Sequence, residues 1–186
     1  SEIPCPFPIY LYPDTVTVVP PDYSPAITYS LVGGAGDATL GDGLDTTYAR
    51  FAYPSSSPPG GGHPWSGVYY TFPATTVPEG STITSRNLVA KAQASASGTH
   101  LQYAVADDIL DTYTPLHVEA TGAAWAVSTS GFGWLWSAAT WHSATNFISS
   151  MAAGTIQAYV MPYDLWTDGR TVDISEVFIL VDGTCP

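Results

Sequence analysis

The chain has 186 residues and a mass of 19.6 kDa, which predicts one domain and argues against two. Hydrophobic residues make up 45% and aromatic residues 13%, enough to bury a core, so composition excludes an intrinsically disordered chain. Four Lys and Arg stand against 16 Asp and Glu, and a net charge of -12 argues against nucleic acid and anionic membrane surfaces as partners.

The sequence contains no run of 18 apolar residues and no signal-peptide pattern. We therefore expect no membrane span, and a protein that is cytoplasmic, already processed, or released by a route that needs no signal. The abundance of Ser and Thr (40 residues), Gly (17) and Pro (16) favours strands and turns over helices.

The sequence of residues 1–28 predicts an extended arm that docks on a partner. The run Thr15–Val19 favours a strand. Seven prolines exclude a helix from this segment: Pro4, Pro6, Pro8, Pro13, Pro20, Pro21 and Pro25. Residues 29–186 form the predicted domain body.

Short strands separated by turns are predicted along the body. They are Ile27–Val32, Thr47–Tyr53, Gly67–Phe72, Ile83–Ala96, Leu101–Ala106, Leu116–Ala120, Ala124–Ser128, Thr155–Pro162 and Val172–Asp182. In Ile83–Ala96, small apolar residues at alternate positions favour a long strand over a helix.

One helix is predicted over Trp136–Ala153, ended by Gly154. About ten strands with no βαβ alternation and no repeat predict an all-β fold, an antiparallel β-sandwich of jelly-roll type.

Motifs of catalysis are absent from the sequence. It contains no G-x-S-x-G, H-E-x-x-H, C-x-x-C or P-loop pattern, and the glycines of Gly33–Gly36 are expected in a turn. The four histidines are far apart and are expected to be structural. Glycoside hydrolysis needs two carboxylates that face each other across a cleft, and Glu119 and Glu176 lie in predicted strands without a cleft motif. A solvent-facing position is the default for strand carboxylates, although alternation places Glu176 outward, with Ile174 inward, only through a register shift. We therefore expect no enzymatic activity.

Calcium is the cofactor the sequence leaves open. Asp37, Asp42 and Asp45 cluster in a turn-rich stretch, and carboxylates on turns are typical calcium ligands. Aspartate is also favoured in turns and caps, so a purely structural role stays open.

Six tryptophans and twelve tyrosines offer aromatic surface for stacking on sugar rings. Trp65, beside a glycine run, and Trp166, in a turn, are the tryptophans expected to face outward and contact a glycan. Trp125, Trp136 and Trp141 are assigned to the core.

Cys5 and Cys185 are the only cysteines and lie at opposite ends of the chain. A disulfide between them requires the termini to meet and an oxidising environment. Two unpaired thiols are the alternative.

The order of four segments resembles a jelly-roll domain that recurs in virion proteins of tailed bacteriophages. The segments are Leu40–Phe51, Trp141–Gly154, Thr155–Pro162 and Val172–Gly183. The resemblance implies a non-enzymatic virion component of the minor tail, fibre, neck or capsid-decoration type, and transfers no functional residue.

On this interpretation the protein resides in the extracellular particle and assembles with other virion proteins, as a homo-oligomer. A host cell-wall glycan is a further expected partner. The alternative function is an extracellular carbohydrate-binding module that uses exposed aromatic residues.

Overall fold

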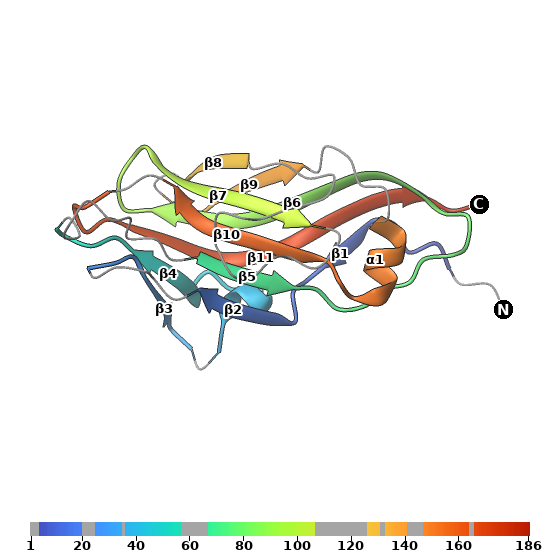
Figure 1. The fold of residues 1–186 in the computed structure, drawn as a ribbon, viewed down its shortest axis with the longest axis horizontal. Helices are drawn as coiled ribbons and strands as arrows, with labels where there is room; N and C mark the ends of the chain where they lie inside the picture. Colours follow the sequence, from blue (N-terminus) through green and yellow to red (C-terminus); the bar gives the residue numbers. More distant parts are fainter. Residues whose placement is uncertain are drawn as a thin grey trace.

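The computed structural model describes residues 4–19, 25–34, 36–56, 67–106, 126–130, 133–140, 147–163 and 166–186. These residues form two antiparallel sheets stacked face to face, with one short helix at one end (Figure 1). The predicted all-β sandwich is confirmed.

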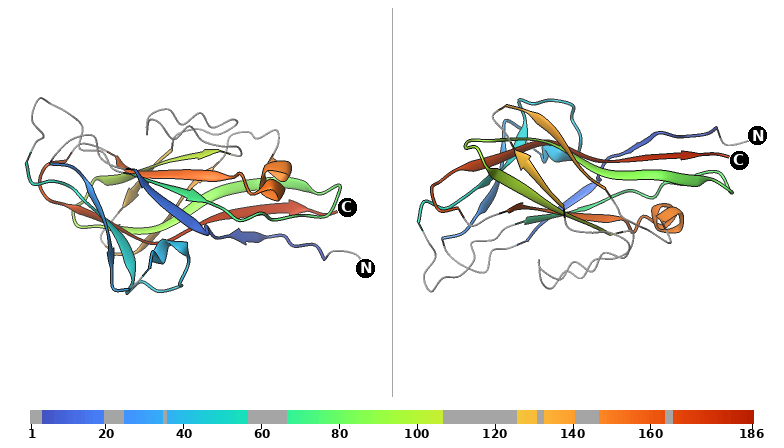
Figure 2. Two further views of the ribbon diagram at one scale, coloured as in Figure 1. Left: turned by 60° about the horizontal axis from the view of Figure 1, so that its bottom comes forward. Right: turned by 90° about the horizontal axis from the view of Figure 1, so that it is seen from above.

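The first sheet has the strand order β3–β4–β11–β6–β9, and β1 also pairs with β11. Its strands are β3 (Thr28–Val32), β4 (Tyr48–Ala52), β11 (Thr171–Thr184), β6 (Thr82–Ala94), β9 (Leu135–Thr140) and β1 (Ile9–Leu11). The two long strands β6 and β11 run side by side to the end of the molecule where both chain termini lie (Figure 2).

The second sheet has the order β2–β5–β10–β7–β8. Its strands are β2 (Thr15–Val19), β5 (Gly67–Thr71), β10 (Gln157–Tyr163), β7 (Thr99–Ala106) and β8 (Ala126–Ser130). The short helix α1 (Phe147–Ala153) precedes β10, and the 3-10 turn η1 (Ala38–Leu40) lies between β3 and β4.

The core lies between the sheets and follows strand alternation. On β6, Leu88 and Ala90 point inward, and on β11 Val177, Ile179 and Val181 do the same. The small side chains of β6 leave room for the large residues of the second sheet, among them Tyr70 and Tyr103.

The N-terminal segment is part of the sandwich, which corrects the predicted separate arm. Within residues 4–19, β1 pairs with β11 of the first sheet and β2 pairs with β5 of the second. Leu11 and Ile27 are buried in the core. The prolines exclude helix as predicted, but the apolar residues between them gain more from burial than from leaving the domain.

The predicted helix Trp136–Ala153 is wrong in its first part. Residues 135–140 form β9, which pairs with β6 so that Trp136 lies opposite Lys91; among the described residues of this stretch, Phe147–Ala153 are helical. β9 contains three consecutive small residues, Ser137, Ala138 and Ala139, which a strand beside β6 accommodates, and this pairing overrides the helical spacing. Gly154 ends the helix as predicted, with a positive φ of 73°. The predicted strand Leu116–Ala120 lies outside the described residues.

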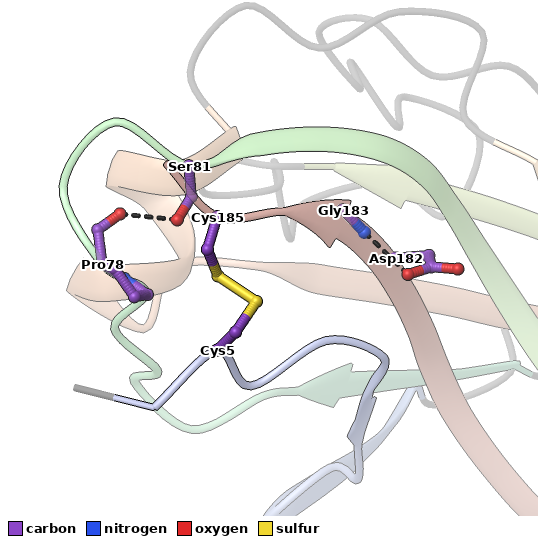
Figure 3. Close-up of a disulfide and its surroundings, with 6 residues drawn as sticks. All are labelled: Cys5, Pro78, Ser81, Asp182, Gly183 and Cys185. Atoms are coloured by element: carbon purple, nitrogen blue, oxygen red, sulfur yellow. Dashed lines mark hydrogen bonds between the residues drawn. A yellow bond between two sulfur atoms is a disulfide. The ribbon is translucent and has the colours of Figure 1, made fainter. Parts of the chain in front are cut away.

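A disulfide joins Cys5 to Cys185, with Cα atoms 5.9 Å apart (Figure 3). It ties the segment before β1 to the end of β11, at the end of the molecule that carries the termini (Figure 1). Beside it, the Gly183 N–H donates to the Asp182 carboxylate (2.8 Å) and the Ser81 hydroxyl donates to the Pro78 carbonyl (2.6 Å). No helix in the described part of the chain is long and apolar enough to cross a membrane.

Candidate functional site

The outer face of the first sheet contains an interruption in the pairing of β11. On one side β11 pairs with β6 along most of its length. On the other side it pairs with β4 over residues 171–174 and with β1 over residues 179–181. Residues 175–178 therefore have no strand partner on that side within the described chain, and the register shifts between Ile174 and Glu176. The turn η1 and the loop after it pack against β11 here.

The loop after η1 is fixed to the sheet by a group of polar contacts that we name the polar wall: Asp45, Lys91, Ser175 and Glu176. The Lys91 ammonium lies 2.8 Å from Asp45 Oδ2, and the Ser175 hydroxyl donates to Asp45 Oδ1 at 3.0 Å. The backbone N–H of Gly43 donates to Glu176 Oε1. These contacts hold the loop against the outer face of the first sheet.

Next to the polar wall lies a group of rings that we name the aromatic platform: Tyr10, Tyr12, Trp136 and Phe178. The centroids of Tyr10, Tyr12 and Trp136 lie 5.6, 5.3 and 5.7 Å from that of Phe178. Phe178 is only 7% exposed, whereas Tyr10, Tyr12 and Trp136 are 57%, 39% and 55% exposed. A buried ring thus supports three exposed ones.

Strand register explains why these rings meet. Tyr10 lies opposite Leu180 and Trp136 lies opposite Lys91, so both side chains share the outer face with Phe178. Tyr12 packs on Gly41, where a Cβ atom would lie 2.6 Å from the tyrosine ring, and Gly41 has a φ of 98°. Only glycine meets both conditions without strain.

The platform and the wall meet at Lys91, whose ammonium lies 5.2 Å from the centroid of the Trp136 ring. This is a cation–π distance. The same ammonium therefore contacts the edge of the platform and the carboxylate of Asp45.

A second polar group, which we name the Arg50 cluster, lies further along the same face and consists of Arg50, Asp173 and Gln93. Arg50 donates to both Asp173 oxygens (2.7 and 3.0 Å), and Gln93 donates to Oδ2 at 3.2 Å. Above it the rings of Tyr48 and Trp134 approach to 5.5 Å, although β11 and β6 separate β4 from β9 in the sheet. The side chains of Tyr48 and Trp134, which come from opposite sides of the β11–β6 pair, therefore meet above these two strands.

Glu176 is buried, which corrects the predicted solvent-facing position. It is 4% exposed, and its Oε2 atom has no hydrogen-bond partner among the described residues. Burial raises the pKa of Glu176, and the nearby carboxylates of Asp42 and Asp45 raise it further. In contrast, the hydrogen bond from Lys91 lowers the pKa of Asp45. The register shift places this side chain on the outer face of the sheet, and the loop after η1 covers it there, which alternation alone does not reveal.

The described tryptophans follow the predicted division in part: Trp166 is exposed as expected, whereas Trp136, assigned to the core, is exposed as well. Trp136 is exposed and belongs to the platform, because its pairing opposite Lys91 places its side chain on the outer face of the first sheet. Trp166 is 36% exposed, but the Arg170 guanidinium lies 3.5 Å from its ring centroid. It precedes β11, whose first residue is about 23 Å along the strand from Phe178. Trp65, Trp125 and Trp141 lie outside the described residues.

The three aspartates proposed for calcium each hold the loop together separately. Asp37 accepts from the Thr39 N–H (2.9 Å) and from the Tyr29 hydroxyl, and Asp42 accepts from the Leu44 N–H (2.9 Å). Asp45 belongs to the polar wall. Within the described residues, no three His, Cys, Asp or Glu side chains gather as a metal site. Glu119 and three of the histidines lie outside that part of the chain.

No protein-family model and no curated protein matches the sequence. Among solved structures, TmCBM61 in complex with β-1,4-galactotriose has a TM-score of 0.50 at 9% identity, over 89% of this chain and 88% of that one. The family 11 carbohydrate-binding module from Clostridium thermocellum, in complex with a β-1,3-1,4-mixed-linked tetrasaccharide, gives 0.49 at 9% identity, over 92% and 95%. The enzymatically active domain of tailspike protein 4 of bacteriophage CBA120 gives 0.48 at 12%, over 90% of this chain but 19% of that one. At these identities the similarity shows the β-sandwich fold alone.

Proposed function

We propose that the protein is a non-catalytic glycan-binding β-sandwich module, and that its ligand lies on the aromatic platform against the polar wall. One observation carries the proposal: three exposed rings gather around the buried Phe178, directly beside the charged side chains of Lys91 and Asp45.

The chemistry of a sugar matches both parts of this surface. A pyranose ring has faces of C–H groups that stack on an aromatic side chain, and a rim of hydroxyls that donate and accept hydrogen bonds. Tyr10 and Trp136 supply exposed ring surface, while Lys91 and Asp45 supply a donor and an acceptor beside it. A gathered set of exposed rings is also unusual for a surface without a binding role.

The fold supports the proposal in a general way. TmCBM61 shares the sandwich architecture and was solved with a bound galactotriose. The position of the ligand on this chain is argued from its own side chains, since the similarity reaches the fold only.

Substitution of the platform tests the proposal. The purified protein is applied to an array of oligosaccharides, and hits are titrated by calorimetry. We expect Trp136→Ala to weaken binding at least about tenfold, the equivalent of about 1.4 kcal/mol, because it removes an exposed stacking surface. Trp166→Ala is the matched control, an exposed tryptophan outside the platform, and should leave affinity unchanged.

Two results would contradict the proposal: no binding to any glycan on the array, or binding that Trp166→Ala removes and Trp136→Ala does not. The second result would place the ligand at the tryptophan that the sequence pattern favoured.

The role in a virion remains a prediction from the sequence resemblance. It is compatible with glycan binding, since a particle that adsorbs to a host wall needs a sugar-binding surface. A constant copy number of this chain in gradient-purified particles, measured by mass spectrometry, would support it.

A further inference from the structure

We propose that the ligand of this face is an uncharged glycan, and that the Lys91–Asp45 and Arg50–Asp173 ion pairs exclude acidic ones. The inference rests on the proposed function and names the class of sugar that the site accepts. Its basis is that the cations beside the platform already form ion pairs with carboxylates of the protein.

Both cations of the polar wall and the Arg50 cluster face carboxylates of the protein. Lys91 lies 2.8 Å from Asp45. Arg50 donates to both oxygens of Asp173, the bidentate geometry in which a guanidinium binds a carboxylate most strongly. An acidic sugar would have to displace Asp45 or Asp173 to reach either cation.

The charge balance around the platform also opposes an anion. The polar wall and the Arg50 cluster together contain three carboxylates, on Asp45, Asp173 and Glu176, against the two cations. The whole chain carries a net charge of -12. A uronate, sulfate or phosphate group therefore meets repulsion both at a distance and at the site.

An uncharged hydroxyl fits the same groups without displacing them. The ammonium of Lys91 has three N–H donors, and only one of them is needed for Asp45. The carboxylate of Asp45 accepts from Lys91 and Ser175 through different oxygens, and each oxygen accepts more than one hydrogen bond. A sugar hydroxyl, which donates and accepts, can therefore bind between them while the ion pair stays intact.

The test compares neutral and acidic oligosaccharides on wild-type protein and two variants of equal charge. Probes are β-1,4-galactotriose, cellotriose and trigalacturonate, together with the array hits. Asp45→Asn keeps the side-chain shape and releases Lys91 from its carboxylate. Asp168→Asn changes the net charge by the same amount, but in the loop before β11, where Asp168 pairs with Arg170.

We expect the wild type to bind neutral oligosaccharides at least tenfold more tightly than acidic ones. Asp45→Asn should raise the affinity for trigalacturonate about five- to tenfold, and added salt should reduce the gain, whereas Asp168→Asn should not produce it. Binding of acidic glycans by the wild type as strong as that of neutral ones, or equal behaviour of the two variants, would overturn the inference and leave the proposed function standing. Absence of binding to both classes would instead refute the proposed function.

Discussion

Removal of the disulfide should cost this domain a large part of its stability. Cys5 and Cys185 are 180 residues apart in sequence, so the bond closes nearly the whole chain into one loop. The loop-entropy relation gives about 18 cal/mol/K for a loop of this length, or about 5 kcal/mol at 25 °C, as an upper value. Domains have about 5 to 15 kcal/mol in total, so a loss of this full size would be a third of the stability or more.

The measurement is equilibrium urea unfolding of the double variant Cys5→Ser, Cys185→Ser, followed by circular dichroism. With a slope of about 2 kcal/mol/M, a loss of 5 kcal/mol lowers the midpoint by about 2.5 M. Dithiothreitol should lower the wild-type midpoint to that of the variant and leave the variant unchanged. A midpoint that falls by less than about 0.5 M would refute the reasoning, since it would mean that the pairing of β1 with β11 restrains the N-terminal segment without the bond.

Three further substitutions test the site. Glu176 has a raised pKa in the folded protein, so its contribution to stability is complete below the unfolded-state pKa and is lost as pH rises through the folded-state pKa. In thermal unfolding, Glu176→Gln should therefore be more stable than the wild type at pH 8 and should lose this advantage at pH 4. A gain in stability that does not depend on pH would contradict this reasoning. Asp173→Ala removes the bidentate partner of Arg50 and should cost about 2 kcal/mol in urea unfolding, because Arg50 keeps some contact with water; a loss below about 0.5 kcal/mol would show that the pair contributes little. Gly41→Ala should cost about 1 to 2 kcal/mol and weaken glycan binding, since its Cβ collides with the Tyr12 ring; unchanged affinity would mean that Tyr12 makes no contact with the ligand.

Strand alternation predicted most of the fold because it reports burial directly. Leu88 and Ala90 on β6 and Val177 and Ile179 on β11 lie in the core on the parity that the sequence shows. The predicted strand limits also match those of β3, β4 and β5 to within one residue. Apolar residues at every second position fix the buried face whatever the partner strand is.

The aromatic platform could not be predicted in the same way, because exposure depends on what covers a strand. Trp136 has the size and apolarity of a core residue, and its register opposite Lys91 places it on the outer face, where it is exposed. Tyr10 was assigned to a separate arm, and its place beside Phe178 depends on a pairing across 170 residues of sequence. Alternation within one strand contains no information about either fact.

The interruption on β11 links the core to the proposed binding face. If β4 or β1 also paired with Ser175–Phe178, this edge of β11 would carry a continuous ladder of hydrogen bonds with no space for the loop after η1. Glu176 and Asp45 would then not form the polar wall. Instead the loop occupies that space, and Phe178 supports three rings while Val177 and Ile179 are anchored in the core. The platform is thus built around a ring of β11, a strand whose residues 172–179 are all buried. Support of the exposed rings by a buried one would reduce the entropy lost when the proposed uncharged glycan binds.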